Sequence, residues 1–157
     1  MGRPRETMTV DFKFKRAPAY RVASVAWKGP WSDARIRAKF YSVAAWARAR
    51  GLRTGDWVFR EPAERSWEVG IEILGKAKSK GAFRVKTYPR ARVASITFDP
   101  EVVAARVAYH GMADWLRWRR KEGEVKSVGM YREIYPGDPW KDKTAYARTE
   151  IQIVVRP

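Results

Sequence analysis

The sequence predicts an α+β fold, an antiparallel sheet with two long helices packed on it. The first observation is an internal repeat, because the run Arg-Val-Ala-Ser-Val at 21–25 returns as Arg-Val-Ala-Ser-Ile at 92–96. The second observation is that the sequence after each copy shows the same order of side-chain patterns, first one typical of a helix and then two typical of strands. Such consecutive strands pair antiparallel and leave the helices on one face of the sheet. We therefore expect a single domain over 10–157 that is a tandem duplication of a strand-helix-strand-strand module, about 10–75 and 82–157, with a ligand groove between the modules.

In the first repeat, alternation of apolar and polar side chains predicts half-buried strands. The expected strands are Val10–Lys15, Tyr20–Trp27, Trp57–Glu61 and Trp67–Leu74. Ser32 or Asp33 can cap a helix that runs to about Arg50, where Gly51 ends it. The apolar side chains of this helix that keep helical spacing are Ile36, Phe40, Val43 and Ala47.

The second repeat follows the same scheme after the lysine-rich joint Leu74–Gly81. Its expected strands are Phe83–Thr87, Arg92–Phe98, Val128–Tyr135 and Tyr146–Val155. Asp99 and Pro100 are expected to open a helix to about Glu122, because a proline in the first helical turn costs no hydrogen bond. The expected apolar stripe of this helix is Val103, Val107 and Trp115.

The closing strand of each repeat alternates strictly, so its two faces differ. The apolar faces are Val69, Ile71 and Ile73 in one strand and Ile151, Ile153 and Val155 in the other. These faces are expected to lie under the helices. Glu68 and Glu150 then lie on the other face, toward solvent or a groove.

Composition favours a folded, soluble chain. Hydrophobic residues make up 45% of the sequence and aromatic residues 13%, which excludes a disordered protein. No apolar run approaches the ~20 residues that span a bilayer, and Met1–Glu6 has no apolar signal core. With no cysteine and only one histidine, His110, we expect a cytoplasmic protein without metal or cofactor. Residues 1–9 are expected to form a disordered tail.

The formal net charge of +16 favours anionic partners. Lys76–Arg92 contains seven basic residues and no acid, and Arg117–Lys121 forms a second basic cluster. One interpretation is a surface that binds nucleic acid or another polyanion. The other is a solvated basic surface, and charge alone does not distinguish the two. Monomer and homodimer both remain open.

Glu150 is the first candidate for a binding residue, because it opens the most regular strand and corresponds to Glu68 in the first repeat. A carboxylate among aromatic rings favours cations, since the ring faces are also electronegative. When buried, it can serve as a general acid or base. The plain alternative is a strand glutamate paired with an arginine. Tyr131, Glu133 and Tyr135 share one strand face by period two. The candidate aromatic walls are Trp31, Phe59, Trp67, Tyr131 and Tyr135.

Four short motifs follow one another along the chain: Ala26–Trp31, Trp67–Ile73, Tyr131–Pro139 and Thr149–Ile153. Together they resemble the GyrI-like family of small-molecule-binding domains, which includes the effector-binding domains of multidrug-sensing regulators. The resemblance implies the duplicated module and a groove for planar aromatic, often cationic, compounds. It assigns ligand contact to Glu150, Trp31 and Tyr135. About ten residues precede the first expected strand, too few for a DNA-binding helix-turn-helix, so we expect a stand-alone member.

Some stand-alone members of this family hydrolyse reactive, cyclopropane-bearing toxins. The resemblance therefore also implies a hydrolase of strained or electrophilic molecules, in which Glu150 activates water and Tyr135 donates a proton to the leaving group. Whether the chain is an enzyme remains open at this point. Phe98–Glu101 stands where the family pattern has a second Gly-Pro-aromatic motif, so one wall of the groove is expected to differ.

Overall fold

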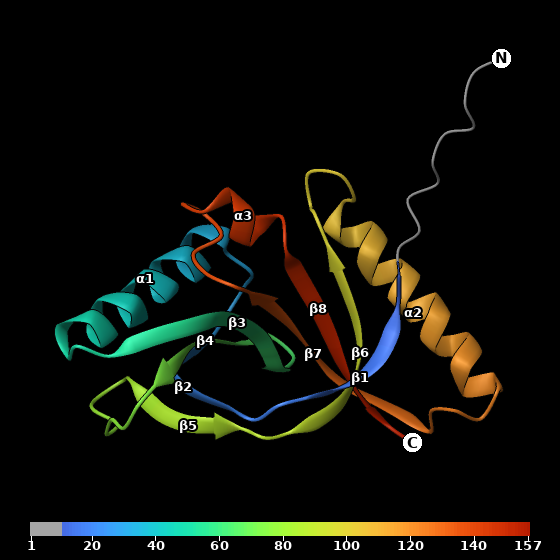
Figure 1. Cartoon of the computed structure of the whole chain (residues 1–157), viewed down its shortest axis with the longest axis horizontal. Coiled ribbons are helices and arrows are strands. Elements are labelled where there is room, and N and C mark those ends of the chain that lie inside the picture. Colours follow the sequence, from blue (N-terminus) through green and yellow to red (C-terminus); the bar gives the residue numbers. More distant parts are fainter. Residues whose placement is uncertain (1–10) are drawn as a thin grey trace, which may run out of the picture.

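The computed structural model describes residues 11–157, so the expected tail at 1–9 lies outside the described residues. The described chain is an α+β fold with one antiparallel sheet of eight strands and three helices (Figure 1). The strands lie in the order β1-β6-β8-β7-β3-β4-β2-β5. Their bounds are Lys13–Ala17 for β1, Tyr20–Lys28 for β2, Arg53–Ala63 for β3, Ser66–Leu74 for β4, Arg84–Tyr88 for β5, Ala91–Phe98 for β6, Ser127–Tyr135 for β7 and Thr149–Arg156 for β8. The predicted fold class is confirmed.

Two short links force the sheet to curl. β1 lies at one edge and β2 lies beside the other edge, six strand spacings away, which is about 29 Å in a flat sheet. Only residues 18–19 connect β1 to β2, so three Cα–Cα steps separate the two strands, and these reach at most about 11 Å. The link from β5 to β6 is equally short, at 89–90. The two edges therefore approach each other, and the sheet curls into a half-barrel (Figure 1).

The edge strands cross between the two halves of the predicted duplication. β1 belongs to the first predicted repeat but pairs with β6 of the second, and β5 of the second pairs with β2 of the first. β3 and β7 pair at the centre and join the halves. The boundaries expected for the repeats, about 10–75 and 82–157, therefore do not coincide with the two halves of the sheet. The duplication itself stays a prediction.

The first helix, α1 (Asp33–Ala49), agrees closely with its predicted bounds. The Ser32 side chain caps its start by accepting a hydrogen bond of 3.1 Å from the Arg35 amide. Gly51, with φ of 66°, follows its end in the left-handed conformation that glycine adopts without strain. The buried side chains of α1 are the four predicted ones and Trp46.

The second helix, α2 (Ala105–Lys121), begins later than predicted. The Asp99 carbonyl accepts hydrogen bonds of 2.9 Å from the amides of Val102 and Val103, so a turn precedes the helix. The expected stripe is wrong at Val107, which is 53% exposed, whereas Val103 and Trp115 are partly buried against the core under α2. The fully buried residues of the helix are Ala108, Met112 and Leu116, so packing on the sheet centres the buried stripe one position after Val107.

The third helix, α3 (Lys143–Tyr146), shortens the last predicted strand. Tyr146, the first residue of that predicted strand, is the last residue of this four-residue helix, and β8 starts only at Thr149. Asp142 caps α3 by accepting a hydrogen bond of 2.9 Å from the Thr144 amide. None of the helices within 11–157 has the length and apolar composition of a membrane span.

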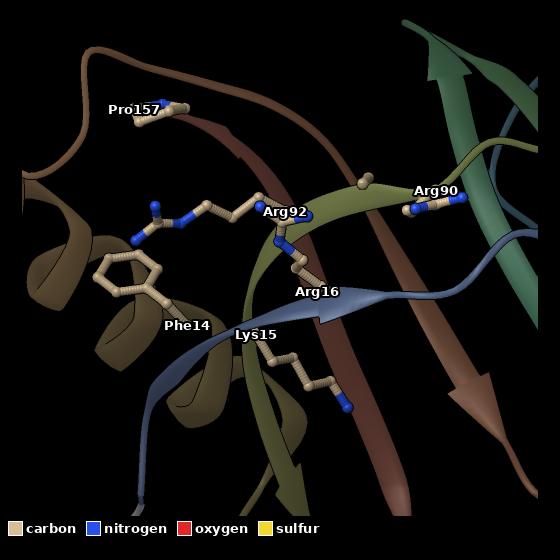
Figure 2. Close-up of a pocket in the computed structure, with 7 residues that line it drawn as sticks. Phe14, Lys15, Arg16, Arg90, Arg92 and Pro157 are labelled. Carbon is tan, nitrogen blue, oxygen red and sulfur yellow. The ribbon is translucent and has the colours of Figure 1, made fainter.

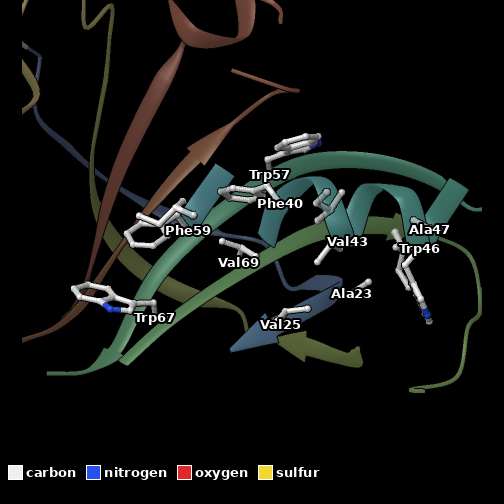
Figure 3. Close-up of a cluster of buried hydrophobic side chains, with 13 residues drawn as sticks. Ala23, Val25, Phe40, Val43, Trp46, Ala47, Trp57, Phe59, Trp67 and Val69 are labelled. Atoms are coloured by element: carbon white, nitrogen blue, oxygen red, sulfur yellow. The ribbon is translucent and has the colours of Figure 1, made fainter. Parts of the chain in front are cut away.

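Most of the core lies between the helices and one face of the sheet, and a smaller buried cluster lies on the other face: Tyr20, Val22, Val58, Tyr88 and Ile134. Under α1, Phe40 and Val43 pack above Val69 of β4, and Trp57 of β3 stacks on Phe40 with ring centroids 5.2 Å apart (Figure 3). A second cluster lies under α2, where Met112 packs with residues of β6 and β8. The apolar faces predicted for the closing strands therefore do lie under the helices. We call this face of the sheet the helix face and the other the opposite face.

Candidate functional site

The central strand pair β3–β7 brings aromatic side chains and one carboxylate together on the helix face. Trp57 lies opposite Tyr135, and Phe59 lies opposite Glu133, in register. Directly opposed residues of an antiparallel pair point to the same face. Trp57 and Phe59 belong to the core under α1, so Glu133 and Tyr135 share that face.

Two tyrosines hold the Glu133 carboxylate. The Tyr109 hydroxyl, from α2, donates to Oε1 at 2.5 Å, and the Tyr135 hydroxyl donates to Oε2 at 2.6 Å. Burial, and then the negative charge of Glu133, raise the pKa of both tyrosines above the ordinary value. Both hydroxyls therefore stay protonated and remain donors to the carboxylate.

A second carboxylate lies nearby on the same face. Tyr131 packs edge-on against Tyr109 with ring centroids 5.3 Å apart, and its hydroxyl donates to Glu61 at 3.1 Å. Burial and the hydrogen bond to Glu61 raise the pKa of Tyr131. Within residues 11–157, neither Glu61 nor Glu133 forms an ion pair with a lysine or arginine. Half-buried carboxylates without basic partners are notable in a chain with a net charge of +16.

We call the aromatic side chains on this face the aromatic strip: Trp57, Phe59, Trp67, Tyr131 and Tyr135. Two exposed indole rings, Trp31 and Trp140, extend this strip. At one end Trp31 is 52% exposed and packs edge-on against Phe59 and Trp67, with centroids 5.4 and 5.3 Å away. At the other end Trp140 is 40% exposed and packs against Tyr41, with centroids 5.9 Å apart. Exposed ring surface therefore lies beside Phe59 and Trp57, the residues of β3 that are in register with Glu133 and Tyr135.

Glu150, the carboxylate favoured by the sequence, lies on the opposite face. It is in register with Ile134, the neighbour of Glu133 in β7, so the two glutamates point in opposite directions. Its Oε2 accepts hydrogen bonds from Lys15 at 2.6 Å, and from Ser95 and Gln152 at 2.7 Å each. Burial alone would raise the pKa of Glu150, but these hydrogen bonds and the charge of Lys15 outweigh it and lower the pKa.

Glu68 is likewise buried in a polar network on the opposite face. Its carboxylate accepts hydrogen bonds from Arg60 at 2.7 Å and Tyr88 at 2.6 Å, and it pairs with Lys86. Gly70 has no side chain and so leaves room for Tyr88, because a Cβ at position 70 would lie 2.7 Å from the hydroxyl oxygen of Tyr88. Both glutamates singled out in the sequence are thus ion-paired, Glu68 with Arg60 and Lys86, and Glu150 with Lys15 where the alternative interpretation expected an arginine.

The structure divides the predicted site residues by face. It brings together the five aromatic candidates, Trp31, Phe59, Trp67, Tyr131 and Tyr135, and separates them from Glu68 and Glu150. Glu133 and Tyr109 are not among the residues predicted from the sequence for the site. Period two already placed Glu133 between Tyr131 and Tyr135, and this was the available signal. Nothing in the local pattern pointed to Tyr109.

A separate cavity of about 460 Å³ lies where β1 meets β6 (Figure 2). Its lining residues are Phe14, Lys15, Arg16, Arg90, Ala91, Arg92 and Pro157. Arg16 and Arg92 lie opposite each other in register, as Figure 2 shows. The charge of this cavity suits an anion, whereas the aromatic strip suits a cation. Within residues 11–157 no three His, Asp or Glu side chains are grouped to hold a metal ion.

Comparison with known proteins agrees with this fold. The model of the GyrI-like small molecule binding domain matches residues 10–156. The C-terminal domain of EcmrR has a TM-score of 0.73 at 17% identity, covering 95% of this chain and 99% of that chain. A hydrolase encoded by lin2189 from Listeria innocua has a TM-score of 0.59 at 11% identity, over 97% and 96% of the two chains. SAV2435 bound to tetraphenylphosphonium has a TM-score of 0.54 at 9% identity, over 93% and 94%. No curated protein sequence matches the chain.

Proposed function

The chain belongs to the family of GyrI-like small-molecule-binding domains, and from this premise we propose that it binds aromatic cations at Glu133. The observation that carries the proposal is the environment of the Glu133 carboxylate. It accepts hydrogen bonds from two tyrosines, lies opposite Phe59 in a strip of aromatic rings, and has no basic partner in the described chain.

The physical chemistry of this arrangement favours an organic cation. Ring faces attract positive charge electrostatically, and the attraction strengthens when the cation is desolvated. A carboxylate in a partly buried site attracts a cation more strongly than one in water, because the effective dielectric constant is lower. Exposed Trp31 and Trp140 provide additional ring surface for a planar ligand. We place the groove expected from the sequence along the β3–β7 pair.

The net charge of +16 opposes the approach of a cation at long range. Salt screens such repulsion beyond about 8–10 Å. At short range the ligand meets Glu133 and Glu61, whose tyrosine partners are neutral. We therefore expect cation binding to be maintained, and the association rate to rise, as salt increases from low to physiological concentration.

Tryptophan fluorescence can test this function with two compounds of similar shape. Tetraphenylphosphonium, the ligand named for SAV2435, supplies an aromatic cation, and triphenylphosphine oxide supplies a neutral control. We expect saturable one-to-one quenching by the cation and at least about tenfold weaker binding of the neutral compound, since charge-assisted contacts are lost. Equal affinity for both would refute the role of the carboxylate. If neither compound gave a saturable signal, the binding function itself would be refuted.

Hydrolysis at the same place is the second candidate function. The observation that favours it is a carboxylate within 2.6 Å of two phenol hydroxyls, since a carboxylate can accept a proton from water while a phenol donates to a leaving oxygen. A suitable substrate is strained and electrophilic, such as styrene oxide, whose ring opening by water yields a diol. Diol formation that disappears in Glu133→Gln, with substrate binding retained, would support this candidate. Absence of diol above the uncatalysed rate would remove styrene oxide from consideration and leave binding as the function.

A further inference from the structure

A second cavity, of about 500 Å³, contains four arginines. They are Arg60, Arg90, Arg132 and Arg156, and no acidic residue of the described chain lines the cavity with them. The remaining lining residues are mainly small or apolar: Pro89, Ala91, Ser127, Val128, Gly129, Met130 and Val154. The cavity thus combines a concentrated positive charge with an apolar wall.

Arg132 is the buried member of this group. It is only 5% exposed, and its Nε donates to the neutral Gln152 side chain at 2.7 Å. Its Nη2 is buried without a hydrogen-bond partner in residues 11–157, and no carboxylate of that range forms an ion pair with it. Buried guanidinium groups are normally paired, because removing an unpaired charge from water is costly.

The surroundings of Arg132 increase this cost. Arg60 lies directly opposite it in the β3–β7 register, so two cations face each other across the strands. Arg60 has Glu68 as its own ion-pair partner at 2.7 Å, whereas Arg132 has no ion-pair partner within residues 11–157. Burial, together with the charge of Arg60, lowers the pKa of Arg132 by more than the nearby Tyr20 and Glu150 raise it. An anion that reached Nη2 would satisfy the unpaired donor and offset both charges.

We propose that this cavity binds a small organic anion, whose carboxylate or phosphate contacts Arg132 and whose apolar part packs against Val128 and Met130. A guanidinium presents donors in a planar fork that matches both kinds of oxyanion. Arg90 and Arg156 are exposed at the cavity and add charge to its mouth. Because successive residues of a strand point to opposite faces, this site is separate from the one at Glu133.

Isothermal titration calorimetry of the full chain at physiological salt can test the proposal with phenyl phosphate, benzoate and inorganic phosphate. We expect saturable one-to-one binding of at least one of the two organic anions, and tighter binding of phenyl phosphate than of inorganic phosphate. The comparison of phenyl phosphate with benzoate identifies the preferred head group. Organic anions that bind no more tightly than inorganic phosphate would overturn the assignment of the apolar wall.

Three variants locate the site. Arg132→Met removes the buried charge and should weaken the organic anion about tenfold or more, whereas Arg106→Gln removes one exposed charge on α2 and should change affinity less than about twofold. Arg90→Gln alters an exposed residue and spares the core, so its expected loss of about threefold tests the cavity even if the Arg132 variant does not fold. Equal losses in Arg106→Gln and Arg90→Gln would mean that general surface charge binds the anion, and would overturn the proposal.

Discussion

Replacing Glu133 by glutamine is the most informative single change to this protein. Glutamine has nearly the same shape as glutamate; its amide oxygen can accept from one of the two tyrosine hydroxyls that now donate to the carboxylate at 2.5 and 2.6 Å, and its NH2 group can donate to the other. The substitution therefore removes the negative charge and leaves the aromatic strip in place. We expect it to weaken the binding of tetraphenylphosphonium and to leave triphenylphosphine oxide unaffected.

The size of the effect follows from the environment of Glu133. A cation about 4 Å from a carboxylate gains roughly 4 kcal/mol at an effective dielectric constant of about 20. Glu133 is only half-buried, and the ligand loses part of its own hydration, so the net loss should be about 1.5–3 kcal/mol. This corresponds to a fall in affinity of about ten- to a hundredfold.

Glu150→Gln is the matched control for this experiment. It removes the same charge from a neighbouring strand, but Glu150 points to the opposite face and is paired with Lys15 at 2.6 Å. The family resemblance alone predicts that Glu150→Gln weakens cations most, whereas the geometry predicts a change below about twofold, as expected for a remote charge. The affinities can be measured by tryptophan quenching and by calorimetry. A parent-like affinity in Glu133→Gln, or an equal loss in both variants, would refute the reasoning from the structure.

Three further predictions concern stability. Glu150→Gln should lower the free energy of unfolding at pH 7 by about 1–3 kcal/mol. The pKa of Glu150 in the folded protein is lowered from 4.5, so the stabilisation by its charged form is complete above pH 4.5 and is lost as the pH falls through the folded pKa. Thermal melts of parent and variant should therefore converge in acid, and a constant difference would contradict the assigned pKa direction. Gly70→Ala should cost about 1–3 kcal/mol in urea unfolding, because its Cβ would lie 2.7 Å from a tyrosine oxygen; Gly137→Ala, whose Cβ would make only ordinary contacts, should change stability by less than about 0.5 kcal/mol. Met112→Ala should cost about 2–5 kcal/mol, whereas Val107→Ala on the exposed stripe should cost less than about 0.5 kcal/mol. The reverse order would restore the stripe expected from the sequence.

Much of the fold could be predicted because local patterns reflect local geometry. The alternation in 149–156 and 66–74 sorted apolar from polar side chains correctly, since successive side chains of a strand point to opposite faces. The bounds of α1 followed from a serine cap and a glycine stop, which depend only on nearby backbone groups. The start of α2 was less accessible, because the turn at 99–104 competes with helix for the same residues.

The candidate site was only partly predictable. Five aromatic candidates proved to share the helix face, because Trp67 and the tyrosines of β7 follow the strand period. Choosing the carboxylate required more than the period. Glu133 and Glu150 both lie in strands, and only the partners that folding brings to them distinguish the two. Glu133 receives hydrogen bonds from two tyrosines, whereas Glu150 pairs with a lysine.

The sequence by itself determined the class of the fold, the main helices and strands, and the family, because these follow from side-chain periodicity and short motifs. The tertiary structure alone decided that the edge strands cross between the halves of the sheet, that Phe59 lies opposite Glu133, and that Tyr109 reaches over from α2. It also decided that Arg132 is buried without a carboxylate. The physical reason is the same in each case. Strand register, sheet curl and helix orientation are set by packing between residues far apart in the chain, and no local pattern records which of them will meet.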